Sequence, residues 1–321
     1  ALGKGGQQLR MPSPRLRQLG SAIAVRPMDP SDPHHYQRGD KLKKAPGAEP
    51  RPRRASVTAL SAGLPTGGGP PIIPTGRRDS QAVFASRDQS TVIFDWDDTL
   101  FPTTFVRHDK GLKWNVPLKD QRLSTAEMKE VREVLRTCED AAITLLKLAN
   151  MVGNVMIVTL ARSPWLSISC TNFFPRMGEA IKELEVPLLY AQDGVIVDQA
   201  KVNAMSEDEH EAFWSGMKEK TIKEALMKFY SRYEGQSWKN VISIGDSDFE
   251  RRGTIGAVEA YLKSKGVSDK SDKEAGKVVD GHVIKVRSKT IKLVDEPSAE
   301  ELNLELMKLQ SWLPLLVKLD K

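Results

Sequence analysis

Short apolar runs alternate with longer helical patterns along most of the chain. The runs typical of buried strands lie at 91–94, 154–158, 186–190 and 241–244, with 283–286 as a fifth strand toward an edge. Apolar residues that recur every three or four positions predict helices over about 125–150, 165–185 and 209–233. Strands that alternate with helices favour βαβ units. We therefore expect an α/β fold, a Rossmann-like three-layer sandwich with a mostly parallel central sheet.

The end of the chain predicts an amphipathic helix over 298–319. Ser298 precedes Glu301 by three residues, a capping box that satisfies free amides of the first helical turn. Leucines at positions 302, 306, 309, 313, 316 and 319 form one apolar stripe. Packing of this stripe onto the rest of the domain is our first interpretation, and a contact with a partner protein is the alternative.

The first 88 residues differ from the rest in composition and charge. They hold 12 of the 19 prolines and 11 of the 23 glycines, with little apolar periodicity. They also carry 15 Lys and Arg against 6 Asp and Glu, whereas the whole chain has a net charge of only +6. Such a segment buries too little apolar surface to offset chain entropy. We predict a disordered basic tail over 1–88 and a folded domain over 89–321, with nucleic acid bound at most nonspecifically through the tail.

Several other classes of protein are not supported by the sequence. No apolar run approaches the roughly 18 to 20 residues that span a bilayer, so we expect no membrane span and a cytoplasmic protein. The acid-free, Arg-containing first 28 residues leave organelle import as an alternative, although Pro12 and Pro14 interrupt an amphipathic helix there. Cys138 and Cys170 lack the spacing of a zinc or redox motif, and we expect both to be small buried side chains.

Acidic residues gather where two predicted strands end. Asp95, Asp97 and Asp98 follow the first strand directly, and Asp246 and Glu250 follow the fourth. Ligands of open α/β sheets bind beyond the carboxyl ends of the strands. Hard carboxylate oxygens are the ligands that suit Mg²⁺, which fills its remaining positions with water and substrate oxygens. The sequence therefore predicts a Mg²⁺ site for a phosphorylated substrate at this edge of the sheet.

The order of these motifs resembles the haloacid dehalogenase-like (HAD-like) hydrolase superfamily. Its pattern is a strand followed by DxDxT, a strand ending in Thr, a helix-borne Lys, and a strand followed by GDxxxE, and the resemblance covers roughly 91–294. It implies a HAD-like hydrolase domain in which Asp95 is the nucleophile that takes the phosphoryl group. Asp97 corresponds to the general acid and base, and its presence favours a phosphatase. The implied metal ligands are Asp95, the main-chain carbonyl of Asp97, Asp246 and Glu250.

The resemblance also implies residues that hold the phosphoryl group. Thr99 matches the hydroxyl that orients the first loop, and Thr159 matches the phosphoryl-binding residue of the second motif. Arg162, just beyond Thr159, is a further candidate phosphate contact. For the motif lysine we choose Lys218, which lies near the predicted start of its helix.

Two of these assignments have alternatives within the sequence. Lys220 and Lys223 lie on the same helix as Lys218. Asp248 is the alternative to Glu250 as the second acid of the fourth motif. Asp98 and Trp96 also depart from the family pattern, because many members have glycine at the first position and a smaller residue at the second.

The lengths between the motifs leave room for a small flap over 101–124 rather than a full cap domain. We therefore expect an open site and a Mg²⁺-dependent phosphomonoester hydrolase that works through an aspartyl-phosphate, with room for a phosphorylated macromolecule. The alternative is a non-catalytic phosphate-binding or scaffold module with the same fold. Phe105 and Trp114 of the flap are expected either to contact substrate or to pack within a hairpin.

Overall fold

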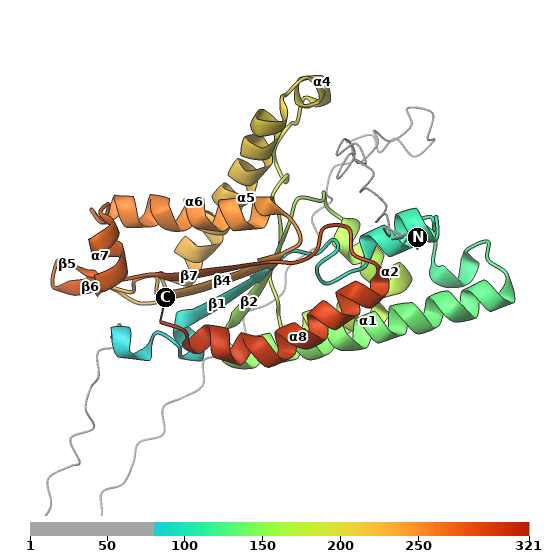
Figure 1. The fold of residues 1–321 in the computed structure, drawn as a ribbon, viewed down its shortest axis with the longest axis horizontal. Helices are drawn as coiled ribbons and strands as arrows, with labels where there is room; N and C mark the ends of the chain where they lie inside the picture. Colours follow the sequence, from blue (N-terminus) through green and yellow to red (C-terminus); the bar gives the residue numbers. More distant parts are fainter. Residues whose placement is uncertain (1–79, 321) are drawn as a thin grey trace, which may run out of the picture. The chain divides into compact units, whose positions relative to one another are not determined.

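Five parallel strands form the main sheet of a computed structural model that describes residues 80–320 (Figure 1). In the sheet order β3-β2-β1-β4-β7, they are Leu188–Tyr190, Asn154–Thr159, Ser90–Phe94, Asn240–Gly245 and Arg287–Lys292. The expected α/β fold with a parallel Rossmann-like sheet is confirmed. Phe94 of β1 pairs with Ile157 of β2 and Ile244 of β4, so these three strands end side by side.

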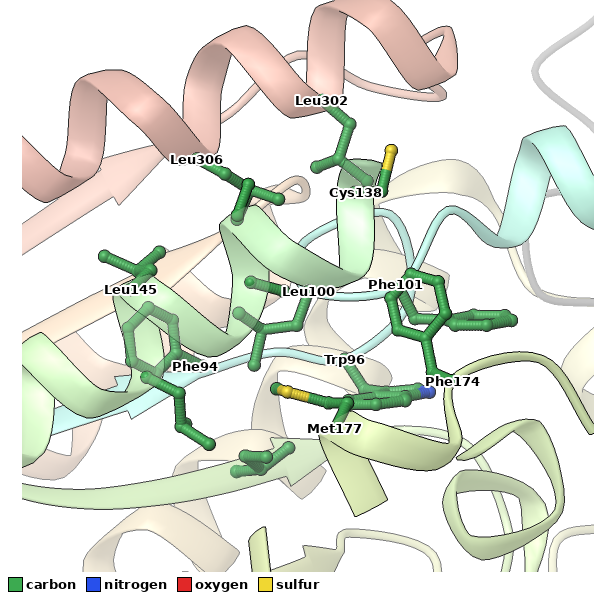
Figure 2. Packing of buried hydrophobic residues seen from close by; sticks show 14 of the residues in the cluster. Phe94, Trp96, Leu100, Phe101, Cys138, Leu145, Phe174, Met177, Leu302 and Leu306 are labelled. Carbon is green, nitrogen blue, oxygen red and sulfur yellow. The ribbon is translucent and has the colours of Figure 1, made fainter. Parts of the chain in front are cut away.

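Alternate side chains of β1 point into two separate apolar cores. Val92 and Phe94 lie in a core with helices α1, α2, α3 and α8, and Figure 2 shows Phe94 there. Ile93 lies in a second core with α5 and α6, the helices on the other face of the sheet (Figure 1). These helices span Thr125–Val152 (α1), Trp165–Phe173 (α2), Pro175–Glu183 (α3), Glu207–Phe229 (α5), Asp248–Ser264 (α6) and Ala299–Lys318 (α8). Burial of β1 on both faces is typical of parallel sheets with helices on either side.

The capping box predicted at the last helix is present. The Ser298 hydroxyl accepts from the Glu301 amide, and the Glu301 carboxylate accepts from the Ser298 amide. The leucine stripe packs onto the domain as our first interpretation expected, and its buried members are Leu302, Leu306, Leu309 and Leu313. At the end of the helix Val317 is buried instead, and Leu319 is exposed.

Two predicted elements are wrong in detail. The predicted strand over 283–286 is not the edge of the main sheet, because β6 (His282–Ile284) pairs only with β5 (Lys277–Val279) in a separate hairpin and β7 is the edge. Asp280 and Gly281 connect β5 and β6 with positive φ angles of 50° and 76°, as a two-residue hairpin turn requires. The predicted helix over 165–185 is two helices, which meet at Phe174. The next residue, Pro175, has no backbone N–H to donate a hydrogen bond that would continue the first helix.

Short elements complete the described part of the chain. They are α4 (Gln199–Asn203), α7 (Lys270–Ala275), the π-helical turn η3 (Phe105–Asp109), and the 3₁₀ turns η1 (Gln81–Val83), η2 (Arg87–Gln89) and η4 (Leu118–Asp120). The flap over 101–124 thus holds η3 and η4 and no β-hairpin. Phe105 is buried in the first core. Of the alternatives for Phe105, packing is the one that the structure shows.

The predicted tail lies mostly outside the described residues, which begin at Ser80. The described part of it, 80–88, forms η1 and most of η2, and Arg87 donates a hydrogen bond to the carbonyl of Asn150 at 2.7 Å. Both cysteines are free and buried, as expected. Within residues 80–320, no helix has the length and apolar character needed to cross a membrane.

Candidate active site

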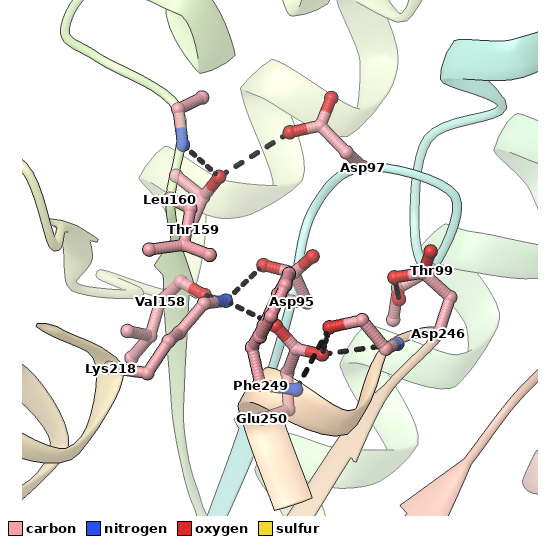
Figure 3. Close-up of polar contacts among 12 residues, drawn as sticks. Asp95, Asp97, Thr99, Val158, Thr159, Leu160, Lys218, Asp246, Phe249 and Glu250 are labelled. Atoms are coloured by element: carbon pink, nitrogen blue, oxygen red, sulfur yellow. Dashed lines mark hydrogen bonds and ion pairs between the residues drawn. The ribbon is translucent and has the colours of Figure 1, made fainter. Parts of the chain in front are cut away.

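The site lies where β1, β2 and β4 end. Asp95 directly follows β1, Thr159 is the last residue of β2, and Asp246 directly follows β4 (Figure 3). The Asp95 amide donates to the carbonyl of Ile244 at 2.9 Å, so the chain continues along β4 before it turns away. The parallel register therefore brings together acids that are about 150 residues apart in sequence.

Asp95, Asp246 and Glu250 form an acidic cluster that could hold a metal ion. One carboxylate oxygen from each lies within 4.8 Å of the other two. Asp95 and Glu250 are buried, and Asp246 is partly buried. Three of the four residues predicted as metal ligands are thus brought together through their side chains.

Lys218 enters this cluster from α5. Its ammonium group donates to Asp95 Oδ1 at 2.5 Å, to the Val158 carbonyl at 2.6 Å and to Glu250 Oε1 at 2.8 Å (Figure 3). The side chain is 1% exposed. Of the three lysines considered from the sequence, Lys218 is the one that lies at the acidic cluster, because Lys220 is exposed and Lys223 is only partly buried.

Close packing of α5 against α6 fixes this position. A Cβ atom built on Gly253 of α6 would lie 2.8 Å from Lys218 Cβ and 3.0 Å from the Glu219 amide nitrogen. Real Cβ atoms need more room than that, so glycine allows the backbones of the two helices to approach at this point. The approach brings Lys218 of α5 within reach of Glu250 in the first turn of α6.

Burial dominates the electrostatics of the cluster. It raises the pKa of Asp95 to about 8, against the opposing effect of Lys218 and with a further upward contribution from Glu250. Burial also raises the pKa of Asp246 well above its usual range, and nearby Asp95 adds to this effect. Burial lowers the pKa of Lys218, but Asp95 and Glu250 outweigh it and hold that pKa above the usual value. Three carboxyl groups face one ammonium group, so their full ionisation would leave an excess of negative charge, and the raised pKa values of Asp95 and Asp246 reflect this cost. A divalent cation would offset that charge.

Glu250 uses both of its oxygens within the protein. Oε1 accepts from Lys218, while Oε2 accepts from the Ser247 amide at 3.1 Å and from the Ser247 hydroxyl, completing a capping box at the start of α6. A Cβ atom on Gly245 would lie 2.8 Å from Glu250 Oε2, so no larger residue fits there without a shift. Asp248, the alternative second acid, is partly exposed and lies 3.8 Å from Arg251.

The Asp97 carboxylate stands apart from the acidic cluster. Oδ1 accepts from the Thr103 hydroxyl at 2.6 Å and from the Trp165 indole nitrogen at 2.8 Å, and Oδ2 lies 3.4 Å from the Thr159 hydroxyl. Burial raises the pKa of Asp97, and these donors partly offset the rise. Asp97 is therefore held by Thr103 of the flap and Trp165 of α2 rather than by the carboxylates of the cluster.

The two departures from the family pattern have structural explanations. Asp98 adopts a positive φ of 49°, the conformation that glycine adopts most easily. Its carboxylate accepts from the Thr104 amide and hydroxyl, both at 2.8 Å, and these bonds offset the backbone cost. Trp96 is fully buried, stacks on Phe101 with centroids 5.6 Å apart, and donates to Ser169 (Figure 2). Its bulk lies in the core, not beside Asp95.

The remaining predicted residues fall into two groups. Thr99 is buried and donates to Asp246 Oδ1 at 3.3 Å, so it joins the first loop to the acidic cluster. Arg162 is exposed and donates to Gln192, and it makes no hydrogen bond or ion pair with the acidic cluster among residues 80–320. Thr103 and Trp165, which hold Asp97, were missed from the sequence. The available signal was their position just beyond the DxDxT motif and the second strand.

Comparison of the chain with protein families, with curated proteins and with solved structures finds no match in any of the three. The fold and the site define the class on their own. The protein has a parallel α/β sheet with a buried acidic cluster, able to hold a metal ion, at the carboxyl ends of its strands.

Proposed function

We propose that this protein is a Mg²⁺-dependent phosphomonoester hydrolase of the HAD-like type, acting through an aspartyl-phosphate on Asp95. The observation that carries the proposal is the contact of Lys218 with Asp95 and Glu250 inside the acidic cluster. A buried carboxylate that is aligned by an ammonium group and directly follows a parallel strand has the attributes of a nucleophile. The order of the four sequence motifs adds independent support.

In the first step an oxygen of Asp95 attacks the phosphorus atom, forming a bond to phosphorus as the bond to the leaving oxygen breaks. Asp97 in its acid form gives its proton to that leaving oxygen. Lys218 neutralises part of the charge on the phosphoryl oxygens, and we expect the Thr159 hydroxyl to donate to one of them.

In the second step Asp97, now a carboxylate, removes a proton from water while the water oxygen attacks the phosphorus atom. The bond between Asp95 and phosphorus breaks, which releases inorganic phosphate and restores both carboxyl groups. Thr103 and Trp165 hold Asp97 in one orientation through both steps. The mechanism therefore needs two carboxyl groups in different surroundings, and Asp95 and Asp97 have different partners.

Asp95 and Asp246 are the side chains that we expect to hold Mg²⁺, with Glu250 at the same cluster and the Asp97 main-chain carbonyl as the family implies. Asp95 Oδ2 receives no hydrogen bond within the described part of the chain and so keeps its lone pairs for a cation. A bound Mg²⁺ would supply positive charge that favours the ionised form of Asp95 and offsets charge on the phosphoryl group.

The proposal is tested by phosphate release from a panel of phosphomonoesters, measured with Mg²⁺ and with EDTA. We expect Mg²⁺-dependent turnover that falls by about 10³-fold or more in Asp95→Asn. Asp248→Asn is the matched control, because it changes a nearby aspartate outside the acidic cluster, and it should retain turnover. Wild-type turnover in Asp95→Asn would refute the mechanism. Phosphate binding without turnover across the panel would favour the scaffold module instead.

A further inference from the structure

Two half-buried tryptophans lie together near the first loop, and one of them, Trp165, contacts Asp97. Trp165 is the first residue of α2 and Trp114 belongs to the flap, and their ring centroids are 5.9 Å apart at an interplanar angle of 75°. The Arg107 guanidinium lies 6.0 Å from the centre of the Trp165 ring. We call these three side chains the tryptophan corner.

The exposure of these tryptophans differs from that of the packing tryptophans. Trp96, Trp214 and Trp238 are 0%, 6% and 2% exposed, whereas Trp114 and Trp165 both keep part of their surface open to solvent. The tryptophan corner therefore presents an aromatic surface that the described residues do not cover.

This surface is held in place. The Asn172 side chain donates to the Trp114 carbonyl at 2.8 Å, and Phe101 meets Trp165 nearly at a right angle with centroids 6.0 Å apart. The indole nitrogen of Trp165 is bound to Asp97 at 2.8 Å. Arg107 is exposed and forms no ion pair among residues 80–320, so its charge stays available to a ligand. A fixed surface of this kind costs little entropy to occupy.

The position of the corner relative to Asp97 defines what it would touch. A leaving oxygen that takes a proton from Asp97 must lie within about 3 Å of that carboxyl group. The Trp165 indole nitrogen is within hydrogen-bond distance of the same carboxyl group. The Trp165 ring is therefore close enough to Asp97 for the first atoms beyond the leaving oxygen to reach it.

We propose that the tryptophan corner binds the leaving group and that it selects aryl phosphates, in which an aromatic ring is bonded directly to the ester oxygen. This inference rests on the proposed function, because Asp97 defines the leaving-group side. Aromatic rings pair with other rings edge to face and stack with guanidinium groups, and both partners are present here. In a nucleoside 5′-phosphate a sugar would separate the ring from the corner. Among protein side chains, phosphotyrosine has the required bonding.

The test compares two non-hydrolysable ligands of similar size, benzylphosphonate and cyclohexylmethylphosphonate, by calorimetric titration in the presence of Mg²⁺. We expect the wild-type protein to bind the aromatic ligand more tightly by between about twofold and tenfold, the range for one aromatic pair. Trp114→Leu should remove this preference. Trp312→Leu is the matched control, because Trp312 is an exposed tryptophan of α8, and it should keep the preference.

Trp165→Phe separates the aromatic surface from the hydrogen bond to Asp97. It should keep the preference for benzylphosphonate, because a ring remains, while turnover falls because Asp97 loses a donor that orients its carboxyl group. Equal affinity of the wild-type protein for the two ligands would overturn the inference, as would an unchanged preference in both Trp114→Leu and Trp165→Leu. These affinities do not depend on turnover, so a failure of the proposed hydrolase activity is recognised separately, by the Asp95→Asn comparison.

Discussion

Lys218→Met removes the single ammonium group of the acidic cluster while keeping a side chain of similar length. Three buried acceptors then lose their donor, namely Asp95 Oδ1, Glu250 Oε1 and the Val158 carbonyl. Because these groups lie away from water, none can replace the lost bond with a solvent molecule unless the site opens. We therefore expect a large loss of stability from one substitution.

The size of this loss follows from the burial of the pair. Removal of one partner from a buried ion pair costs about 3 to 5 kcal/mol, since it leaves an uncompensated charge. A domain of this size has a free energy of unfolding of about 5 to 15 kcal/mol, so the variant should still fold. Without divalent cations, Lys218→Met should therefore lower the free energy of unfolding by about 3 to 5 kcal/mol at about pH 9, where the Asp95 carboxyl group of the wild-type protein is ionised.

The loss should also depend on pH in a defined direction. Burial already raises the pKa of Asp95 to about 8, and Lys218 opposes that rise. Without Lys218 the folded-state pKa rises further above its unfolded value, so the folded state loses stability as pH rises from the unfolded pKa toward the folded one. At about pH 6 the carboxyl group keeps its proton in both folded proteins, so Asp95 adds little to the difference between them, although the Val158 carbonyl still lacks its donor. Above about pH 8 the wild-type carboxyl group ionises beside Lys218 while that of the variant keeps its proton, so the loss should be larger at about pH 9.

Urea denaturation followed by circular dichroism, in EDTA and at both pH values, measures this effect. Lys220→Met is the control, because Lys220 is an exposed lysine two residues further along the same helix, and its stability should be unchanged. Turnover of Lys218→Met should fall by about 10²-fold or more, as expected when a preorganised charge is removed. An equal stability of Lys218→Met and the wild-type protein at about pH 9 would refute the reasoning, as would a loss that is the same at about pH 6 and at about pH 9.

Three further predictions concern packing, capping and metal binding. Gly253→Ala should lower the free energy of unfolding by about 1 to 3 kcal/mol, because the added methyl group clashes with α5. The control is Gly216→Ala, at a helical position with open space around it, which should raise the free energy of unfolding by up to about 1 kcal/mol. Urea denaturation measures both values. Ser298→Ala should cost about 1 kcal/mol by removing the capping box of α8, measured as a lower midpoint of thermal unfolding. Mg²⁺ should raise that midpoint more at about pH 8 than at about pH 5, because burial raises the pKa values of Asp95 and Asp246 and a cation favours their ionised forms. An equal rise at both pH values would contradict this prediction.

The periodic parts of the fold could be predicted from the sequence because one physical effect dominates each of them. The strand at 91–94 is a continuous apolar run, as burial on both faces requires, and α1 repeats its apolar residues at helical spacing over 28 residues. Where local turn chemistry decides, the prediction was wrong. The apolar pattern at 283–286 suited an edge strand, but the turn at Asp280 and Gly281 pairs it with 277–279 instead.

The acids of the site could be predicted because they are tied to strand ends, and the parallel register places strand ends together. The partners of Asp97 could not be predicted in the same way. Thr103 contacts Asp97 from within the flap, and Trp165 contacts it from the first turn of α2. Both contacts depend on the conformation of loops, which the spacing of apolar residues in the sequence does not predict. The conformation of Asp98 was also hidden, because its positive φ is supported by Thr104, six residues further along.

The charge of the acidic cluster indicates that the cluster has a functional role rather than a purely structural one. A buried ion pair kept only for stability would match its charges, since each unmatched buried charge lowers the free energy of unfolding. Here Lys218 faces Asp95 and Glu250 with Asp246 beside them, and burial raises the pKa of Asp95 and of Asp246. Such unfavourable arrangements are typical of sites that bind a charged ligand. A divalent cation would provide the positive charge that ionised Asp95, Asp246 and Glu250 lack. The close approach of α5 and α6 at Gly253 holds Lys218 and Glu250 together in this cluster.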